Sequence, residues 1–355
     1  MAARRRKASM FVREAQAQGR SLEAEVNEFV GSALASSTRK GYTAAENLFV
    51  KIIFGEGAVG GEIYPLSGNL LLLYIYVMSK VGYAASTVRT YVAGLKTRNI
   101  ENGHRLSRLA CERARRAVRA AERHCSNTAI SRGLLPPEKI VVRPSQLRAA
   151  RRPGYSKNPH WVAMIACAFA LLRARECLAL RYGDVRFSTK AGMDVMTLMV
   201  RRSKCDQLGR GESLTVGCAK RSARRPCGDA LCPVHNMYQY LQQGLSRGYL
   251  TSEKEALIFT APAGSGEGLK YGDYLDGLRA IFQQVGDVGG SLSTHAMRRS
   301  GANWLWQAGV PLFNIREFGR WSTKGTLEDK YLVGATKTQH HLYSAAMLTG
   351  RYDGM

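Results

Sequence analysis

Apolar side chains recur at helical spacing in successive stretches between residues 36 and 125. After Ser37-Thr38 they occupy Tyr42, Ala45, Leu48, Phe49 and Ile52. Further stretches cover Leu66–Val81, the residues after Ser86-Thr87, and Leu106–His124, where Ala110, Ala114, Ala117 and Ala121 form the packing stripe. This period indicates amphipathic helices, and the opposite faces carry Arg and Lys. The pattern predicts a helical bundle with a basic exterior.

The formal net charge of +25 extends this basic character to the whole chain. A field of that size attracts polyanions, and nucleic acid is the best candidate, ahead of an acidic membrane surface. We expect DNA contacts from Arg39, Lys40, Arg89, Lys96, Arg115 and Arg119. The alternative is a bundle whose charges only keep it soluble. No apolar run approaches the ~20 residues of a membrane helix, so we expect no membrane partner.

The first ten residues, MAARRRKASM, have no signal-peptide core. The eight cysteines show no compact framework spacing, which favours a reducing compartment. We therefore expect an intracellular protein.

The 355 residues allow two domains. We expect a flexible basic arm over 1–25, a helical domain over 26–125, a linker over 126–145, a second domain over 146–331 and a C-terminal segment over 332–355. The linker prediction rests on Gly133 and the Pro136-Pro137 pair.

The second domain mixes helical and strand patterns. Helices are predicted over Trp161–Arg181, Pro233–Leu245 and Tyr274–Val285, and a hairpin over Val195–Val200 and Ser213–Val216. A short strand is predicted over Ala256–Phe259. The predicted fold class is mainly α with a small β-sheet in the second domain (α+β).

Polar residues interrupt two of these apolar patterns. Arg173 and Glu176 are three residues apart, so they share a helix face and the carboxylate can hold the guanidinium toward a ligand. A structural ion pair is the commoner meaning of such spacing. Lys204 lies at the predicted hairpin tip, where it is either an ordinary surface lysine or a mobile proton donor.

The stretch from Thr294 to Tyr331 adds an imidazole, a guanidinium and a phenol. His295 and Arg298 are one helical turn apart, and Gly309 with Pro311 ends that helix and starts another. In so basic a chain, this set indicates chemistry on a phosphate group.

These motifs, in this order, resemble the tyrosine recombinase (phage-integrase-type) superfamily. The matching segments are LLRARECLAL, SKCDQLGRG, HAMRRSGANWLWQAGV and FGRWSTKGTLEDKY. SSTRKGYTAAENLF and YAASTVRTYVAGL resemble that family's helical core-binding domain, which with the catalytic domain forms a two-domain DNA clamp. Asp206-Gln207 and the Gly-Arg-Trp-Ser turn are most similar to mobile-element recombinases of the DIRS and Crypton types.

The resemblance implies roles for individual residues. Tyr331 corresponds to the nucleophile, Arg173 and Arg298 to clamps on the scissile phosphate, and Lys204 to the proton donor. His295 corresponds to an acid/base partner, Trp321 to the remaining member of the active site, and Glu176 to a supporting carboxylate.

The sequence departs from the family pattern in two places. Trp321 stands where many members have His, and the adjacent Arg320 leaves open which side chain reaches the phosphate. The segment between Trp321 and Tyr331 is slightly long, which leaves Tyr343 as an alternative nucleophile.

The implied activity is site-specific DNA recombination through a 3′-phosphotyrosyl intermediate, without ATP, metal or other cofactor. The resemblance also implies a tetramer on DNA, integration or excision of a mobile element, and a C-terminal segment that packs on a neighbouring protomer. The location would be the nucleus in a eukaryotic host, otherwise the cytoplasm or nucleoid. The alternatives are a type IB-like topoisomerase and a non-catalytic DNA-binding descendant.

A further group comprises Cys218, Cys227, Cys232 and His235. Three thiolates and an imidazole are a ligand set for structural zinc. The loose spacing between Cys227 and Cys232 favours the alternative, in which Cys-Pro-Val simply begins a helix of a recombinase core.

Overall fold

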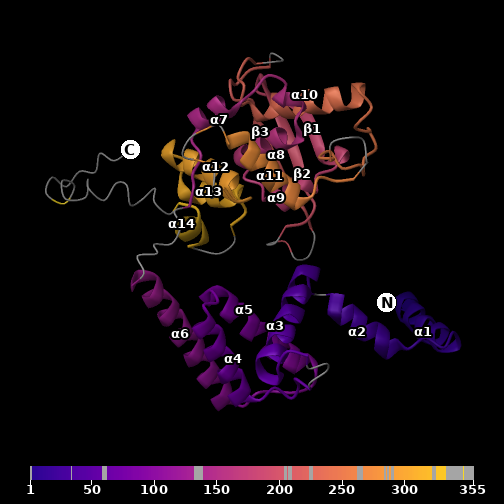
Figure 1. The fold of residues 1–355 in the computed structure, drawn as a ribbon. Helices are drawn as coiled ribbons and strands as arrows, with labels where there is room; N and C mark the ends of the chain where they lie inside the picture. Colours follow the sequence, from indigo (N-terminus) through magenta and orange to yellow (C-terminus); the bar gives the residue numbers. More distant parts are fainter. Residues whose placement is uncertain are drawn as a thin grey trace. The chain divides into compact units, whose positions relative to one another are not determined.

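The computed structural model describes residues 2–32, 34–57, 62–131, 139–203, 206, 210–223, 227–261, 267–283, 285, 288, 292–321, 325–332 and 347. The chain forms two compact units, Met1–Pro136 and Pro137–Met355 (Figure 1). None of the helices within the described ranges is both long and apolar enough to cross a bilayer.

The first unit is helical. Its elements are α1 (Ala2–Ala17), α2 (Leu22–Ser32), α3 (Ser36–Phe54), α4 (Gly68–Val81), α5 (Ala85–Glu101) and α6 (Arg108–Ser131). The core lies among α3 to α6, where Phe49, Leu71, Tyr74 and Leu95 are buried. Ala114 and Ala121 of the predicted stripe are buried against this core. The predicted bundle with basic outer faces is therefore confirmed.

Two segments of this unit contain more helix than the sequence pattern indicates. The arm expected to be flexible is helical over Ala2–Ala17, because its Ala, Arg, Gln and Glu residues favour a helix. The predicted linker begins inside α6, which continues to Ser131 because nothing before Gly133 interrupts the helix.

The second unit combines helices with one small sheet. Its helices are α7 (Pro144–Ala150), α8 (Pro159–Phe169), α9 (Ala174–Leu178), α10 (Pro233–Ser246), α11 (Tyr271–Phe282), α12 (Ala296–Gln307), α13 (Leu312–Phe318) and α14 (Thr326–Lys330). Strands β1 (Val185–Lys190), β2 (Met193–Val200) and β3 (Glu212–Gly217) form an antiparallel sheet in the order β1-β2-β3. The predicted fold class, mainly α with a small β-sheet, is confirmed.

Helix α8 is central to this unit and contacts α9, α10, α11 and α12 (Figure 1). All residues from Trp161 to Ala168 are buried, which explains why that stretch is apolar on every side. Helix α12 approaches α8 closely at Gly301, where an added Cβ would lie 1.9 Å from the carbonyl oxygen of Ala168. Backbone contact this close fixes the position of α12, and with it that of Arg298.

The helix predicted over Trp161–Arg181 is wrong as one element. It breaks after Phe169, and Leu171 adopts a positive φ of 46° before α9 begins at Ala174. The sequence between them contains no Gly or Pro, so the break depends on tertiary contacts.

The sheet differs from prediction in two details. The hairpin of β2 and β3 is confirmed, and Leu198 pairs with Leu214 across it. Strand β1 was not predicted, because its mostly exposed residues VRFSTK lack a strong apolar alternation. Residues 256–259 form only an isolated bridge between Arg181 and Leu257, not the expected strand.

Candidate active site

The break between α8 and α9 positions the first part of the site. Arg173 is the residue before α9, and its backbone N–H donates to Glu176 Oε2 at 2.9 Å. Its guanidinium also forms an ion pair with the other oxygen of Glu176. The carboxylate therefore caps its own helix while it orients the arginine.

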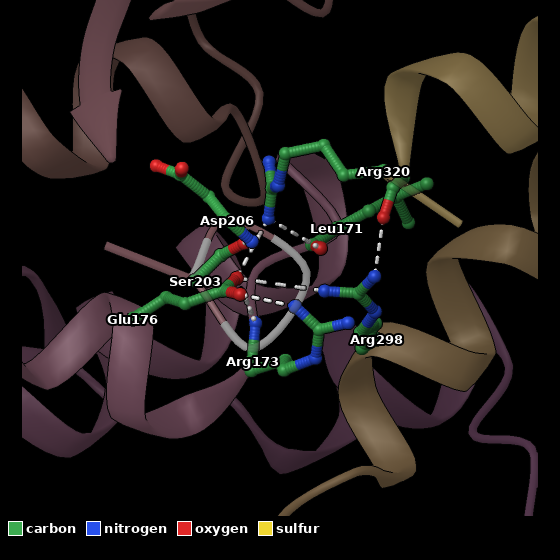
Figure 2. A network of polar contacts seen from close by, with 8 residues as sticks. Leu171, Arg173, Glu176, Ser203, Asp206, Arg298 and Arg320 are labelled. Carbon is green, nitrogen blue, oxygen red and sulfur yellow. Dashed lines mark hydrogen bonds and ion pairs between the residues drawn. The ribbon is translucent and has the colours of Figure 1, made fainter. Parts of the chain in front are cut away.

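Glu176 is a shared partner for three arginines from separate segments. Arg320 Nη2 lies 2.6 Å from Glu176 Oε2, and Arg298 Nη1 lies 3.5 Å from the same oxygen. Arg173 completes the set (Figure 2). Arg298 is fully buried, and the side chains of Glu176 and Arg320 are each only 4% exposed.

The burial and the charges oppose one another in their effect on this carboxyl group. Burial raises the pKa of Glu176, but Arg320, the amide of Arg173 and the Arg173 and Arg298 guanidiniums together hold it below its ordinary value. Burial, together with the Arg173 charge, lowers the pKa of Arg298 to about 10. Both groups therefore remain charged at neutral pH.

Arg320 and Trp321 lie in the turn after α13. Arg320 has a φ of 57°, and its Nη2 also donates to the Leu171 carbonyl at 3.4 Å, the carbonyl released by the break after α8. Arg298 donates to the carbonyl of Gly319. A Cβ at Gly319 would lie 1.7 Å from the Trp321 ring, so the turn requires glycine there.

The two neighbouring side chains of this turn therefore point to different partners. Arg320 is directed at Glu176, whereas Trp321 packs edge-to-face on Tyr331 with ring centroids 4.8 Å apart. Arg298 lies over both rings, 4.5 Å from the centroid of Trp321 and 5.8 Å from that of Tyr331. The sequence had left open which of the two side chains faces the phosphate; Trp321 is the one that adjoins Tyr331.

Tyr331 follows α14 directly, and its side chain is half-buried. The Asn303 side-chain amide donates to the Tyr331 carbonyl at 2.8 Å and to the Arg299 carbonyl at 2.8 Å. Asn303 therefore ties the tyrosine to the helix that carries Arg298.

His295 and Lys204 are the other two residues with implied catalytic roles. His295 is exposed and directly precedes α12, one turn before the buried Arg298. Lys204 lies outside the described residues, as does the alternative nucleophile Tyr343. Ser203 and Asp206, which flank Lys204 in the β2–β3 turn, belong to the same polar network (Figure 2).

The cluster carries more positive charge than Glu176 alone can balance. Among the residues that the structure describes, Arg298 Nε, Arg320 Nε, Arg320 Nη1 and Trp321 Nε1 are buried donors with no acceptor. Buried donors and unbalanced guanidiniums are costly unless an anion binds them. These unpaired donors and the positive charge are therefore concentrated beside the Tyr331 ring.

The predicted DNA contacts lie in the first unit. Arg89, Lys96, Arg115 and Arg119 line a groove between α5 and α6, with Arg108 as a further cation and Glu112 and Glu122 as the acidic residues. Arg39 and Lys40 are exposed on α3.

Comparison with known proteins gives similarity in structure and none in sequence. No family model and no curated protein matches the chain. The post-cleavage complex of XerH site-specific recombinase with palindromic difH substrate matches with a TM-score of 0.55 and 13% identity, over 87% of this chain and 79% of that chain. A tyrosine-to-phenylalanine variant of the Tn1549 transposon integrase, in complex with transposon right end DNA, matches with a TM-score of 0.51 and 14% identity, over 90% of this chain and 98% of that chain.

The chain has the tyrosine recombinase fold.

Two residues of this candidate site were missed as members by sequence reasoning. Arg320 had been noticed only as a rival to Trp321, and its pairing with Glu176 joins positions 144 residues apart. Asn303 carried no signal beyond being a polar residue in a helix with an apolar face. Neither contact has a local spacing that could predict it.

Proposed function

We propose that this protein is a site-specific DNA recombinase that cleaves and rejoins strands through a 3′-phosphotyrosyl intermediate formed at Tyr331. The observation that carries the proposal is the position of Arg298, fully buried, over the rings of Trp321 and Tyr331. Arg173 and Arg320 add positive charge around the same carboxylate. The fold supports the same activity.

In the proposed reaction, the phenolic oxygen of Tyr331 gives up its proton to a base and attacks the scissile phosphorus. The bond from phosphorus to the 5′ oxygen breaks, and that oxygen leaves with a proton. The new ester keeps the free energy of the broken one, so a 5′ hydroxyl can reverse the step without ATP. Rejoining to a different strand recombines the two duplexes.

The arginines act on the transition state in this scheme. The pentacoordinate phosphorane carries more negative charge than the starting diester, so buried guanidiniums stabilise it more than the substrate. Arg173 and Arg298 are the proposed clamps. The donors on Arg320 and Trp321 that lack acceptors among the described residues are available to the non-bridging oxygens.

The remaining roles are assigned by resemblance. Lys204 is the proposed donor to the leaving 5′ oxygen, and His295 is the proposed acid/base partner. Glu176 is a positioning residue: it contacts the three arginines, and the arginines are the groups proposed to contact the phosphate.

DNA is the proposed partner of the first unit as well. The groove between α5 and α6 has five cationic side chains and two carboxylates, a balance that suits a phosphate backbone. We propose that Arg39 and Lys40 extend this contact along α3.

The finer parts of the proposal rest on the sequence resemblance. They are a role in integrating or excising a mobile element of the DIRS or Crypton type, and a homotetramer assembled on DNA. They also include a C-terminal segment that packs on a neighbouring protomer, and residence in the nucleus of a eukaryotic host, otherwise in the cytoplasm or nucleoid.

The proposed function can be tested by incubating the protein with supercoiled plasmid DNA. The reaction is stopped with detergent, the positions of covalently bound protein are mapped, and two copies of the mapped site are then placed on one plasmid. We expect deletion or inversion between the copies. Relaxation without exchange would instead identify a topoisomerase, and tight binding without either would identify a non-catalytic descendant.

A further inference from the structure

Four side chains that serve no part of the proposed reaction converge at one end of the sheet. Cys218 directly follows β3, Cys227 lies in the next loop, and Cys232 and His235 begin α10. Their ligand atoms all lie within 4.8 Å of one another. Three are buried, with Cys232 at 0% and Cys218 and His235 at 4% exposure.

The spacing of these atoms suits a tetrahedral metal centre. Zn–S bonds of about 2.3 Å at tetrahedral angles place two sulfurs about 3.8 Å apart. The sulfurs of Cys218 and Cys232 are 3.9 Å apart, and His235 Nδ1 is 3.9 Å and 3.3 Å from them, respectively. A disulfide needs about 2.05 Å, so these two cysteines are not bonded to each other.

The Nε2 atom of His235, the ring nitrogen that does not face the cysteines, has a buried carboxylate as its partner. His235 Nε2 lies 3.3 Å from Oδ2 of Asp194, which is itself 1% exposed on β2. Asp194 Oδ1 accepts from the Thr189 hydroxyl at 3.3 Å, and its carbonyl accepts from the Cys218 amide at 2.8 Å. A carboxylate on the outer nitrogen turns the inner nitrogen toward a metal and fixes its tautomer.

The sulfurs also receive backbone donors. The amides of Lys220 and Ser222 donate to Cys218, and those of Ala219 and His235 donate to Cys232. These amides add polar contacts around the two sulfurs.

We propose that Cys218, Cys227, Cys232 and His235 bind one structural Zn²⁺ ion. Three thiolates and one neutral imidazole fill a tetrahedral shell, so no position remains for substrate or water. Zinc is favoured over harder cations because the set is dominated by soft sulfur ligands. Binding releases the thiol protons and links the end of β3 to the start of α10.

Zinc binding would also affect the segment between Cys218 and Cys227. Residues 219–226 read AKRSARRP and include four basic residues. A metal that fixes both ends of this segment reduces the conformational freedom of its backbone. The site would therefore constrain this basic segment without taking part in strand cleavage.

The test measures metal in the full-length protein. Protein purified without added metal is analysed for zinc by mass spectrometry, and a second sample is exchanged with Co²⁺. We expect about one zinc per chain, a thiolate-to-cobalt charge-transfer band and the d–d bands of a tetrahedral site. Cys227→Ser, chosen because Cys227 is only partly buried, should lose these bands. Cys125→Ser, which removes a partly buried thiol from the first unit, should retain them.

A second variant separates ligation from folding. Asp194→Asn keeps all four ligands and should weaken zinc affinity by about 10–100-fold in a competition titration with a chromophoric chelator. Folded wild-type protein with neither stoichiometric zinc nor a cobalt spectrum would overturn the proposal. So would a Cys227→Ser protein with unchanged metal content. Neither readout depends on recombination, so this proposal and the proposed function can fail separately.

Discussion

Glu176 Oε2 and Arg320 Nη2 form an ion pair at 2.6 Å, with both side chains 4% exposed. The pair joins the start of α9 to the turn after α13, and the same oxygen also faces Arg298. The candidate active site is therefore assembled around one buried carboxylate.

Removing that carboxylate should destabilise the second unit strongly. Glu176→Gln keeps the size of the side chain but leaves three guanidiniums without their counter-charge, which should cost about 3–5 kcal/mol of unfolding free energy. Denaturant unfolding measures the change. Glu255→Gln is the matched control, because Glu255 pairs with Arg181 and Arg201 at the surface and should cause no comparable loss. Equal effects of the two substitutions would contradict a buried organising role for Glu176.

The same carboxyl group predicts an acid dependence. Its pKa is lowered in the folded state, so the unfolded chain takes up a proton at higher pH than the folded chain does. The stability that Glu176 contributes is therefore complete above its unfolded pKa of about 4.3. It is lost as the pH falls through the lower folded value. Thermal unfolding of wild type and Glu176→Gln should converge below that pH, and parallel curves would contradict the assignment.

Trp321 should act through its N–H as well as its ring. Trp321→Phe keeps an aromatic ring beside Tyr331 but removes a buried donor with no acceptor among the described residues. We expect stability to fall by about 0.5–3 kcal/mol, because Phe is smaller than Trp and leaves part of the buried site unfilled. Strand cleavage should slow by about 10²–10³-fold, as for other lost donors to a developing negative charge. Single-turnover cleavage measures the rate. Full activity in Trp321→Phe would limit this residue to packing.

The groove between α5 and α6 predicts a salt effect on DNA binding. Arg119→Ala and Lys96→Ala each remove one groove cation, so each should weaken binding to any sequence and reduce the slope of log affinity against log salt by about 1. Lys80→Ala removes an equal charge from α4 outside the groove and is the control. Equal slopes for all three variants would indicate that net charge, not this groove, attracts DNA.

Local sequence patterns predicted the parts of the site that lie within one or two helical turns. The contact of Arg173 with Glu176 follows from their helical spacing, whereas the role of His295 one turn before Arg298 stays a prediction. The break at Leu171 was missed because residues 161–181 have no helix-breaking residue, and tertiary contacts override helix propensity there.

Contacts between residues far apart in the chain could not be predicted from the sequence for a related reason. The pairing of Arg320 with Glu176 and the bond from Asn303 to the Tyr331 carbonyl depend on how α12, α13 and α14 pack. The way these helices pack on one another leaves no periodic pattern of residue types in the sequence. The cysteine cluster is intermediate, since its residue types suggested a metal site but its loose spacing left the alternative open until the fold brought the side chains together.

The central claim is that Tyr331 is the nucleophile, and trapping the covalent intermediate tests it most directly. A nicked suicide duplex, built on the mapped site, lets the cleaved fragment diffuse away and leaves the enzyme attached to DNA. Wild type and Tyr343→Phe should form a denaturation-resistant adduct, and Tyr331→Phe should form none while its thermal unfolding stays close to that of wild type. An adduct that persists in Tyr331→Phe, or one that disappears only in Tyr343→Phe, would contradict the account.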